Sequence, residues 1–228
     1  MFKSKKQQFA EAHKVGFCLK PKNLRSLAAF KAAKRQAVPL SCVCLGTATK
    51  TEDQGSTPQC AAYSASSMVE NILWKRNGFV TDDINPEKLY RYAKTIDGSP
   101  DGDGTTLTAI LEAVLKEGWF DTKKCQVRVI TNVFDLKAAI HKYGTCIAGF
   151  DITDEWYEGK PVIAGKASAK AVGGHAVQVV GYDQDYLYIQ NSWGDKWGHR
   201  GFAKLTWDAV AKQFMYAACL TNSLDGLG

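Results

Sequence analysis

The pattern of apolar residues changes near residue 125, and this change constrains the fold more than any other feature of the sequence. Before it, apolar residues recur at helical spacing over 60–76, 86–92 and 106–117. After it, short runs rich in β-branched and aromatic residues predict strands. Helices first and strands second favour an α+β fold with two lobes over an alternating βαβ sheet. The predicted strands cover 126–130, 145–152, 175–182, 186–191, 201–206 and 215–221, with short helices at 134–142 and 207–212.

The positive charge of the chain is concentrated at its N-terminus. The whole chain of 228 residues has a net charge of +6, but residues 1–36 hold ten Lys and Arg against one acid, Glu11. That segment is therefore +9, and the rest of the chain is −3. The sequence predicts a basic arm over 1–36 and a globular domain over 37–228. The helix-rich lobe of this domain covers about 45–125 and its strand-rich lobe about 126–221.

The seven cysteines are scattered, and their odd number leaves at least one thiol unpaired. The chain has no CxxC pair, so the sequence predicts neither a zinc site nor a disulfide framework. Cys42 and Cys44 are separated by one residue, which is poor spacing for a mutual bridge. No apolar run resembles a secretory signal or a membrane span. We therefore expect a reduced, cytoplasmic setting and a monomer.

Three segments far apart in the sequence carry the residue types of a thiol-based hydrolase. The loop Gln54–Cys60 brings a cysteine to the start of a predicted helix, where the helix dipole favours a thiolate. Two glycines precede His175 at the start of an apolar strand, and Asn191 follows another strand. A thiol nucleophile needs an imidazole to take its proton and a third group to fix that imidazole. Cys60, His175 and Asn191 supply these parts, and Gln54 adds an amide donor for an oxyanion.

The motifs around these residues resemble those of the papain-like (C1-type) cysteine peptidases, over about residues 40–221. The matching residues are Gln54 with Cys60 six positions on, Gly174-His175-Ala176, Gly181-Tyr182, Asn191-Ser192-Trp193-Gly194, Trp197-Gly198 and Gly201-Phe202. The resemblance implies a papain-like α+β fold with a helical left lobe, an antiparallel β-barrel-like right lobe and the active-site cleft between them. Ala61 stands directly after Cys60, where the family has an aromatic residue, and Thr57 stands three residues before Cys60, where the family has a half-cystine. These departures suggest bacterial, archaeal or viral members more than secreted ones.

The resemblance also implies roles for individual residues. Cys60 would be the nucleophile and His175 the general base and then the general acid. Asn191 would orient His175, and Trp193 would shield that pair from water. Gln54 and the backbone N–H of Cys60 would form the oxyanion hole. No metal or organic cofactor is implied.

The residues expected to bind substrate come from the same resemblance. Asp103 and Gly104 would hold the substrate backbone by main-chain hydrogen bonds. Gly174 and Ala176 would line the cleft beside the histidine, and Thr105 would contribute with Ala176 to a pocket for a small or medium apolar side chain.

The implied function is that of a cysteine endopeptidase acting on proteins or peptides through an acyl-enzyme. A second possibility is an amidase, peptidoglycan hydrolase or acyl transferase with the same Cys-His-Asn order. The segment from Asn191 to Gly198 favours the peptidase. A catalytically silent binding module is the third possibility, and the complete set of Cys60, His175, Asn191 and Gln54 argues against it.

The basic arm has two weakly helical stretches, 5–15 and 23–36, and allows three interpretations. It is a flexible solvated tail, an inhibitory segment that lies over the cleft as in a zymogen, or a contact for nucleic acid or anionic membranes. Because the globular domain is slightly acidic, nucleic acid is expected to bind only through the arm, if at all. His13 lies in this basic context and is expected to have no role.

Overall fold

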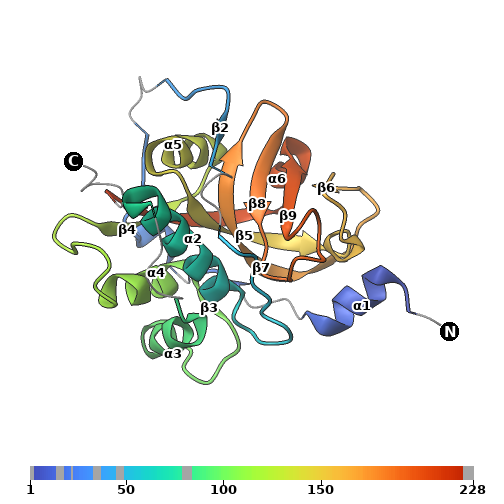
Figure 1. Cartoon of the computed structure of the whole chain (residues 1–228), viewed down its shortest axis with the longest axis horizontal. Coiled ribbons are helices and arrows are strands. Elements are labelled where there is room, and N and C mark those ends of the chain that lie inside the picture. The colour runs from blue at the N-terminus through green and yellow to red at the C-terminus, as the bar shows by residue number, and fades with distance from the viewer. Residues whose placement is uncertain are drawn as a thin grey trace.

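The computed structural model describes residues 3–13, 18–21, 23–32, 37–44, 49–78 and 84–222. Within these ranges the predicted change from helices to strands near residue 125 is confirmed (Figure 1). Residues 14–15 and 33–36, which belong to the two predicted arm helices, lie outside the described part of the chain. No described helix is both long enough and apolar enough to cross a membrane.

The first lobe is built from three helices, α2 (Cys60–Asn77), α3 (Pro86–Ile96) and α4 (Leu107–Lys116). The N-terminus of α3 is capped by Asn85, whose side chain accepts a hydrogen bond from the N–H of Lys88. The N-terminus of α4 is capped in the same way by Thr106. Helix α2 ends at Gly78, which has a φ of 75° that favours glycine. These local signals place the three helices close to where the sequence predicts them.

The second lobe is one eight-stranded, mostly antiparallel sheet with the order β4-β10-β5-β7-β8-β9-β6, and β2 pairs with β7. Its central strands set the site, because Gly149 pairs with Ala176 and Phe150 with His175 across β5 and β7. The strands are β2 (Cys42–Val43), β4 (Gln126–Ile130), β5 (Cys146–Thr153), β6 (Val162–Ile163), β7 (Ala171–Tyr182), β8 (Tyr186–Gln190), β9 (Phe202–Thr206) and β10 (Phe214–Thr221). Helices α5 (Val133–Tyr143) and α6 (Trp207–Gln213) and the 3₁₀ turn η3 (Trp156–Glu158) complete this lobe.

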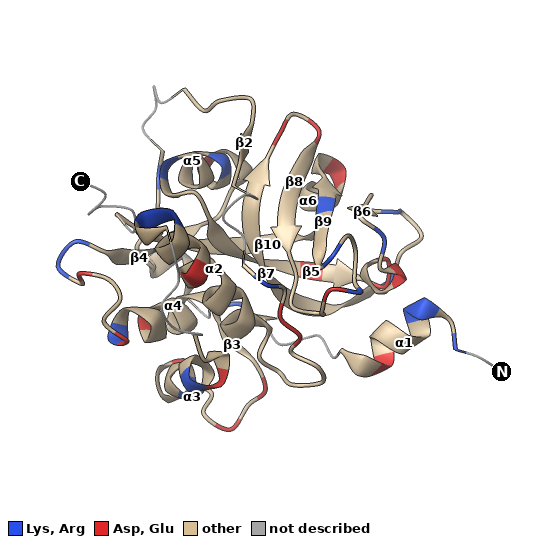
Figure 2. Cartoon of the chain, viewed as in Figure 1, with Lys and Arg blue, Asp and Glu red and all other residues tan. Residues whose placement is uncertain are grey.

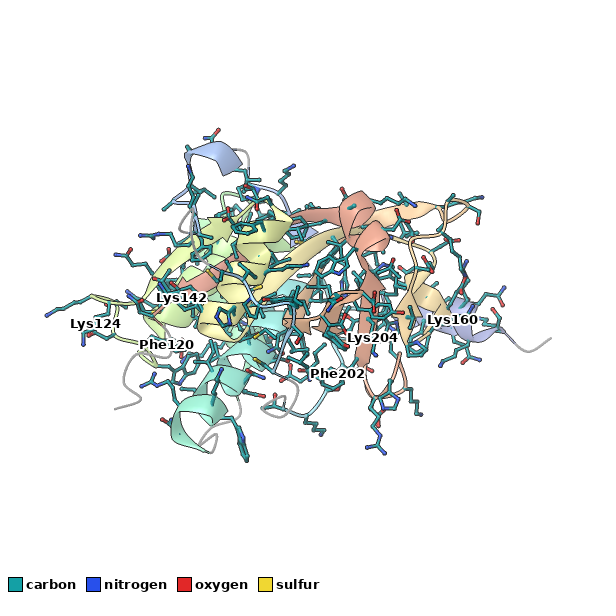
Figure 3. The ribbon with its side chains drawn as sticks, turned by 90° about the horizontal axis from the view of Figure 1, so that it is seen from above. Phe120, Lys124, Lys142, Lys160, Phe202 and Lys204 are labelled. Atoms are coloured by element: carbon teal, nitrogen blue, oxygen red, sulfur yellow. The ribbon has the colours of Figure 1, made fainter. Side chains whose placement is uncertain are left out.

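Two separate hydrophobic cores define the two lobes. One core collects the apolar faces of α2, α3 and α4 together with Ile147, Ala176 and Tyr216 from the sheet. The other core lies in the strand-rich lobe around three buried tryptophans. Seen from above, Phe120 of the helix-rich lobe and Lys204 of the strand-rich lobe lie toward opposite ends of the molecule (Figure 3). Cys60 belongs to the first core and Trp193 to the second, so the predicted site lies where the two lobes meet.

The described part of the arm packs against both lobes. Helix α1 (Lys5–Ala12) contacts η3, and the side chain of Phe9 is buried in the strand-rich core. Strand β1 (Cys18–Leu19) pairs in parallel with β3 (Thr105–Thr106) of the helix-rich lobe. Burying an aromatic side chain such as that of Phe9 stabilises the docked arm by about 1.5–3 kcal/mol. These packed segments are inconsistent with a wholly solvated tail.

The prediction of a helix over 23–36 is wrong within the described residues. Only Leu24–Ser26 is helical, as a single 3₁₀ turn. Beyond it the chain is extended, because the N–H of Phe30 donates to the carbonyl oxygen of Val129 and the N–H of Val129 donates to that of Ala28. Phe30 is buried in the strand-rich core. Tertiary pairing with β4 therefore overrides the weak helical pattern.

The charges of α1 are paired locally and with the strand-rich lobe (Figure 2). Nζ of Lys6 lies 2.7 Å from a carboxylate oxygen of Asp154, just before η3. Nζ of Lys3 pairs with Glu11 of the same segment. This part of the basic arm is thus complementary to an acidic surface of its own chain.

Candidate active site

Cys60 is the first residue of α2, and its thiol faces three backbone donors. Hydrogen bonds from the N–H groups of Cys60, Ala61 and Ala176 act to lower its pKa. Gln59, at the N-cap, makes no side-chain hydrogen bond to these orphan donors. Burial outweighs them, because Cys60 is 0 % exposed and desolvation raises the pKa of its thiol to about 11. In this structure Cys60 is therefore a neutral thiol at neutral pH.

His175 and Asn191 form a buried pair. Nε2 of His175 lies 2.7 Å from Oδ1 of Asn191, which indicates that Nε2 carries the proton and donates it. Oδ1 of Asn191 also accepts the N–H of Ser192 at 2.8 Å, and the backbone N–H of Asn191 donates to the carbonyl oxygen of Gly201. Both side chains are thereby held in place. Nδ1 of His175 is buried and makes no hydrogen bond, so its lone pair remains available for a proton.

Burial also controls the charge of His175. Desolvation lowers the pKa of this imidazole to about 4, against the opposing hydrogen bond to Asn191. A charge on His13 of the arm would lower the pKa of His175 further. No hydrogen bond joins Nδ1 of His175 to Cys60. The site therefore holds a neutral imidazole and a neutral thiol instead of an ion pair.

Gln54 connects the cysteine loop to the segment that carries Asn191. Its Oε1 accepts the hydroxyl of Ser192 at 2.7 Å, and its backbone N–H donates to the carbonyl oxygen of the same residue. Its Nε2 donates to the carbonyl oxygen of Thr57 at 3.0 Å. One of the two protons on Nε2 of Gln54 is thus already in a hydrogen bond. The other proton can be donated to an oxyanion.

Trp193 lies over the histidine, in the position expected of a shield. It is 1 % exposed, and its ring centroid lies 4.8 Å from that of His175. Tyr157 stacks against Trp193 with an interplanar angle of 8°. Trp156 contacts the edge of His175 and is joined to Trp197 by a hydrogen bond from the indole N–H of Trp197 to the carbonyl oxygen of Trp156. The sequence analysis missed Trp156 and Tyr157 because they lie in no recognisable motif.

The main-chain groups of Gly104, which are expected to bind the substrate backbone, have partners within the chain. Its backbone N–H donates to the hydroxyl of Tyr90, and its carbonyl oxygen accepts from Nζ of Lys94. Asp103 is exposed. Strand pairing at the cleft is instead provided by the following residues of β3, Thr105 and Thr106, which pair with the arm.

Cys18 of the arm lies directly on the residues expected to bind substrate. A Cβ atom on Gly174 would lie 2.6 Å from the carbonyl oxygen of Cys18, and one on Gly149 would lie 2.6 Å from its Sγ. The same position over Gly149 is flanked by Leu107 and Tyr216, each 3.8 Å away. The thiol of Cys18 thus fills a small pocket floored by glycine. A negative charge on Cys60 would raise the pKa of the Cys18 thiol, which places the two thiols close together.

The residue after Cys18 is held by Tyr216. The hydroxyl of Tyr216 donates to the carbonyl oxygen of Leu19 at 2.8 Å and accepts the N–H of Leu107. Tyr216 is completely buried and comes from β10, at the back of the pocket. A single side chain therefore connects the arm, the sheet and the start of α4.

His13, for which the sequence predicts no role, lies beside the candidate site. Its Nε2 lies 2.9 Å from a carboxylate oxygen of Asp53, in the loop that leads to Cys60. Its ring stacks on Trp193, with centroids 5.4 Å apart. The arm thus contacts the site on both sides, with His13 near the tryptophan and Cys18 near the cysteine.

Comparisons with known proteins support the same interpretation. Residues 77–219 match the family model described as papain family cysteine protease. Cathepsin B-like cysteine proteinase 3 of Caenorhabditis elegans is 31% identical over 98 residues, which cover 41% of this chain and 26% of that protein. Mouse cathepsin J is 25% identical over 197 residues, or 72% of this chain and 58% of that protein. The first three curated relatives are matched over only 24–49% of their own lengths.

Solved structures show the same fold. The cysteine protease xylellain from Xylella fastidiosa superposes with a TM-score of 0.72 at 17% identity, covering 91% of this chain and 96% of that chain. A procathepsin B from Trypanosoma congolense gives a TM-score of 0.72 at 18% identity, covering 92% and 87%. A closer relationship to bacterial, archaeal or viral members is not supported, because the curated relatives come from animals and a plant.

The family model covers 143 of the 228 residues, more than half of the chain. It includes His175, Asn191 and Trp193, and His175 and Asn191 are joined by a hydrogen bond. The chain belongs to the papain family of cysteine proteases.

Proposed function

We propose that the chain is a cysteine endopeptidase whose cleft is occupied by its own N-terminal arm in this structure. The observation that carries the hydrolase is the oriented His175–Asn191 pair, with an unpartnered Nδ1, beside a cysteine at a helix N-terminus. The pairing of β1 with β3 supports a peptide as substrate, because the cleft accepts an extended main chain.

The proposed reaction starts with transfer of the thiol proton of Cys60 to Nδ1 of His175. The thiolate then attacks the carbonyl carbon of the scissile peptide bond, and the resulting oxyanion accepts hydrogen bonds from the N–H of Cys60 and the side-chain amide of Gln54. The imidazolium donates its proton to the leaving amine as the C–N bond breaks. His175 next takes a proton from water, which attacks the thioester and releases the carboxylic acid. Asn191 keeps the imidazole in the tautomer that these proton transfers need.

The arm supports a zymogen-like state of this enzyme. Two of the similar solved structures are digestive procathepsins from Tenebrio molitor, with TM-scores of 0.68 and 0.69. In this chain the carbonyl oxygen of Cys18 lies against Gly174, and His13 lies against Trp193. A substrate backbone and the arm would need the same space. We therefore propose that the arm is inhibitory, in preference to a nucleic-acid or membrane contact.

The pocket of Cys18 indicates which side chains the cleft accepts. The thiol of Cys18 lies directly over Gly149, and Leu107 and Tyr216 flank the same position. We propose a small side chain at the substrate position that enters this pocket. None of the seven cysteines, all of which lie in the described ranges, is part of a disulfide. This is typical of a reducing compartment, and we retain the cytoplasm as the proposed location.

A peptidyl electrophile tests the proposed function directly. The full-length protein is incubated with a peptidyl vinyl sulfone, and the modified residue is identified by mass spectrometry. We expect modification at Cys60, because its thiol accepts the N–H of Ala176, the residue after His175, whose Nδ1 can take the thiol proton. The Asn191→Ala variant, with a poorly oriented imidazole, should react more slowly at the same residue. Because the arm covers Cys60 in the closed form, the deciding sample is the protein after limited proteolysis has removed the arm; no modification of Cys60 in that sample would contradict the proposal.

The fraction of molecules in which the arm is docked in the cleft is expected to depend on pH. With the arm docked, burial lowers the pKa of His175 to about 4 from an ordinary 6.5. As the pH falls from 6.5 toward 4, the open form takes up a proton that the closed form excludes, so the open fraction rises by up to about tenfold per pH unit. The closed form also loses stability above pH 9.0, because the pKa of the buried Cys60 is raised to about 11. Maximal closure is expected between these limits.

Hydrogen exchange at the amide of Phe30 reports this opening. It is measured from pH 4 to pH 8 and corrected for intrinsic exchange, in the Cys60→Ala variant so that the protein does not cleave itself. The His175→Gln variant removes the titrating group and should flatten the profile below pH 6.5. An unchanged slope in that variant would assign the acid response to other groups. The Lys6–Asp154 pair does not confuse the result, because the pKa of Asp154 is lowered below 3.8 by its hydrogen bond from Lys6.

A further inference from the structure

Cys42 and Cys44 form a cluster with Lys75 that is separate from the active site, and we call it the second thiol cluster. Both cysteines are partly exposed. The remaining five cysteines of the chain are buried, namely Cys18, Cys60, Cys125, Cys146 and Cys219. A soluble reagent that reacts with thiols therefore meets this cluster first.

The backbone places the two thiols on one side of the strand. Cys42 pairs with Tyr182 of β7, and the N–H of Cys44 donates to the carbonyl oxygen of Val180 at 2.7 Å. Residues two apart in an extended strand point to the same face. The side chains of Cys42 and Cys44 share a hydrogen bond, and Sγ of Cys42 lies 3.9 Å from the carbonyl oxygen of Ile140.

Lys75 approaches the same point from the last turn of α2. A Cβ atom on Gly144 would lie 3.0 Å from Nζ of Lys75 and 3.8 Å from Sγ of Cys44. The ammonium group and the sulfur atom therefore flank one backbone position at the end of α5. Figure 1 shows β2 and α5 side by side near the end of α2, in agreement with these contacts.

The surroundings favour a thiolate at Cys44. The hydrogen bond from Cys42 and the charge of Lys75 together lower the pKa of Cys44 to about 6, although burial opposes them. The same hydrogen bond and burial raise the pKa of Cys42, so Cys42 is the proton donor of the pair. Tyr182 of β7 also faces Cys42, and Lys137 of α5 lies over the ring of Tyr182.

We propose that Cys44 is a reactive thiol that takes soft electrophiles and hydrogen peroxide, and that Cys42 is its resolving thiol. This site is independent of the hydrolase reaction. In the active site the pKa of Cys60 is raised while the arm is docked, so the second thiol cluster is the more reactive of the two in the closed protein.

Hydrogen peroxide is expected to oxidise Cys44 and Cys42 in two steps. The Cys44 thiolate attacks one oxygen of hydrogen peroxide, the O–O bond breaks, and hydroxide leaves to give Cys44 sulfenic acid. The thiol of Cys42 then attacks the sulfenyl sulfur, the S–O bond breaks and water leaves. Two thiols and one peroxide thus give one disulfide and two waters. The spacing of Cys42 and Cys44 is poor for a bridge, because Cα atoms two residues apart in a strand are separated by about 6.6 Å, near the upper limit for a disulfide. The bridge therefore requires a local change at the end of β2 and is expected to be easily reduced.

Alkylation tests the reactive thiol. The full-length Cys60→Ala protein is treated with limiting iodoacetamide at pH 7, and alkylation of each cysteine is followed by peptide mass spectrometry. Cys44 is expected to react at least about tenfold faster than Cys42. Lys75→Met should lower the rate at Cys44 by about tenfold, and Lys75→Arg, which keeps the charge, should restore it. Equal rates at the two cysteines, or no effect of Lys75→Met, would overturn the proposal.

Peroxide tests the resolving thiol. Trypsin releases both cysteines in the peptide 36–50, so a bridge between them appears as the loss of two hydrogens from one peptide. This product is expected in the wild-type chain and should revert with dithiothreitol. In the Cys42→Ala variant, dimedone should instead trap sulfenic acid at Cys44. Accumulation of sulfinic acid at Cys44 of the wild-type chain, without the bridge, would show that Cys42 does not resolve it. Peptidase activity in Cys42→Ala and Lys75→Met should equal that of the unaltered chain.

Discussion

Replacing Cys60 by alanine is expected to lower peptidase turnover by on the order of a millionfold, the loss found when the nucleophile of a hydrolytic triad is removed. The physical reason is that no other group can form the acyl intermediate. The remaining cysteine of the cleft, Cys18, is buried and has a raised pKa, and no imidazole hydrogen bond is available to it. Casein cleavage is measured after limited proteolysis has removed the arm. The open enzyme has the higher activity, so the loss in the variant can be followed over the widest range of rates.

The matched control is Cys44→Ala, which removes a thiol of the same size far from the cleft. It should leave turnover unchanged, and its melting temperature reports any effect of losing a cysteine on folding. Cys60→Ser keeps the volume of the side chain and should be nearly as inactive as Cys60→Ala, because a serine hydroxyl is a poor nucleophile beside a neutral imidazole. Casein cleavage by a homogeneous Cys60→Ala preparation would refute the assignment of the nucleophile.

Replacing Cys18 by tryptophan is expected to raise the activity of the full-length chain by about 5- to 150-fold. The thiol lies over Gly149, between Leu107 and Tyr216, where a large ring has no space. Overpacking of this kind costs about 1–3 kcal/mol, which corresponds to that range in the closed-to-open equilibrium. The cost falls on the docked arm alone, because the open form leaves residue 18 in solvent.

Turnover of a small peptide substrate measures this effect, with Cys18→Ser as the matched control that fits the pocket and should remain closed. Hydrogen exchange at the amide of Phe30 gives a second readout, since its bond to Val129 should open more often in Cys18→Trp. Equal activity in the tryptophan, serine and unaltered chains would mean that the arm does not limit access. A loss of the cooperative thermal transition in Cys18→Trp would instead indicate damage to the body of the fold.

The sequence was sufficient to predict the parts of the site that are fixed by short-range rules. Cys60 begins α2 because a Gly- and Pro-containing loop precedes an apolar helical pattern. His175 opens the buried stretch of β7, and Asn191 directly follows β8, as the strand patterns indicated. Three separated motifs therefore located residues that the fold brings together, and the His175–Asn191 hydrogen bond is the clearest result of that arrangement.

The arm could not be predicted in the same way, because its conformation depends on distant partners. Strand β1 has only two residues, Cys18 and Leu19, and its pairing with β3 leaves no periodic pattern in the sequence. The basic residues around His13 give no sign of its contacts, because its partners Asp53 and Trp193 are far away in the chain. Residues 28–30 are extended because β4 offers backbone partners that outweigh a weak helical preference.

For the oxyanion and substrate-binding residues, the sequence predicts which residues take part but not their hydrogen-bond partners. The sequence identified Gln54, but only the structure shows that one of its amide protons is held by Thr57. Resemblance assigned the substrate backbone to Gly104, whose main-chain groups are engaged by Tyr90 and Lys94. The sequence does not predict these partners, because hydrogen bonds between side chain and backbone depend on loop geometry, which residue spacing does not determine.

Because the arm is part of the same chain and contacts the body at several points, dilution is not expected to release the inhibition. The arm contacts the strand-rich lobe through Phe9 and Lys6, the cleft through Cys18, and β4 through Phe30. Each contact is weak alone, but the covalent chain gives it an effective concentration of the order of millimolar. Closure is therefore first order and independent of protein concentration. A single cut between the arm and the body would convert it into an ordinary second-order equilibrium, in which a nanomolar enzyme loses its inhibitor by dilution alone.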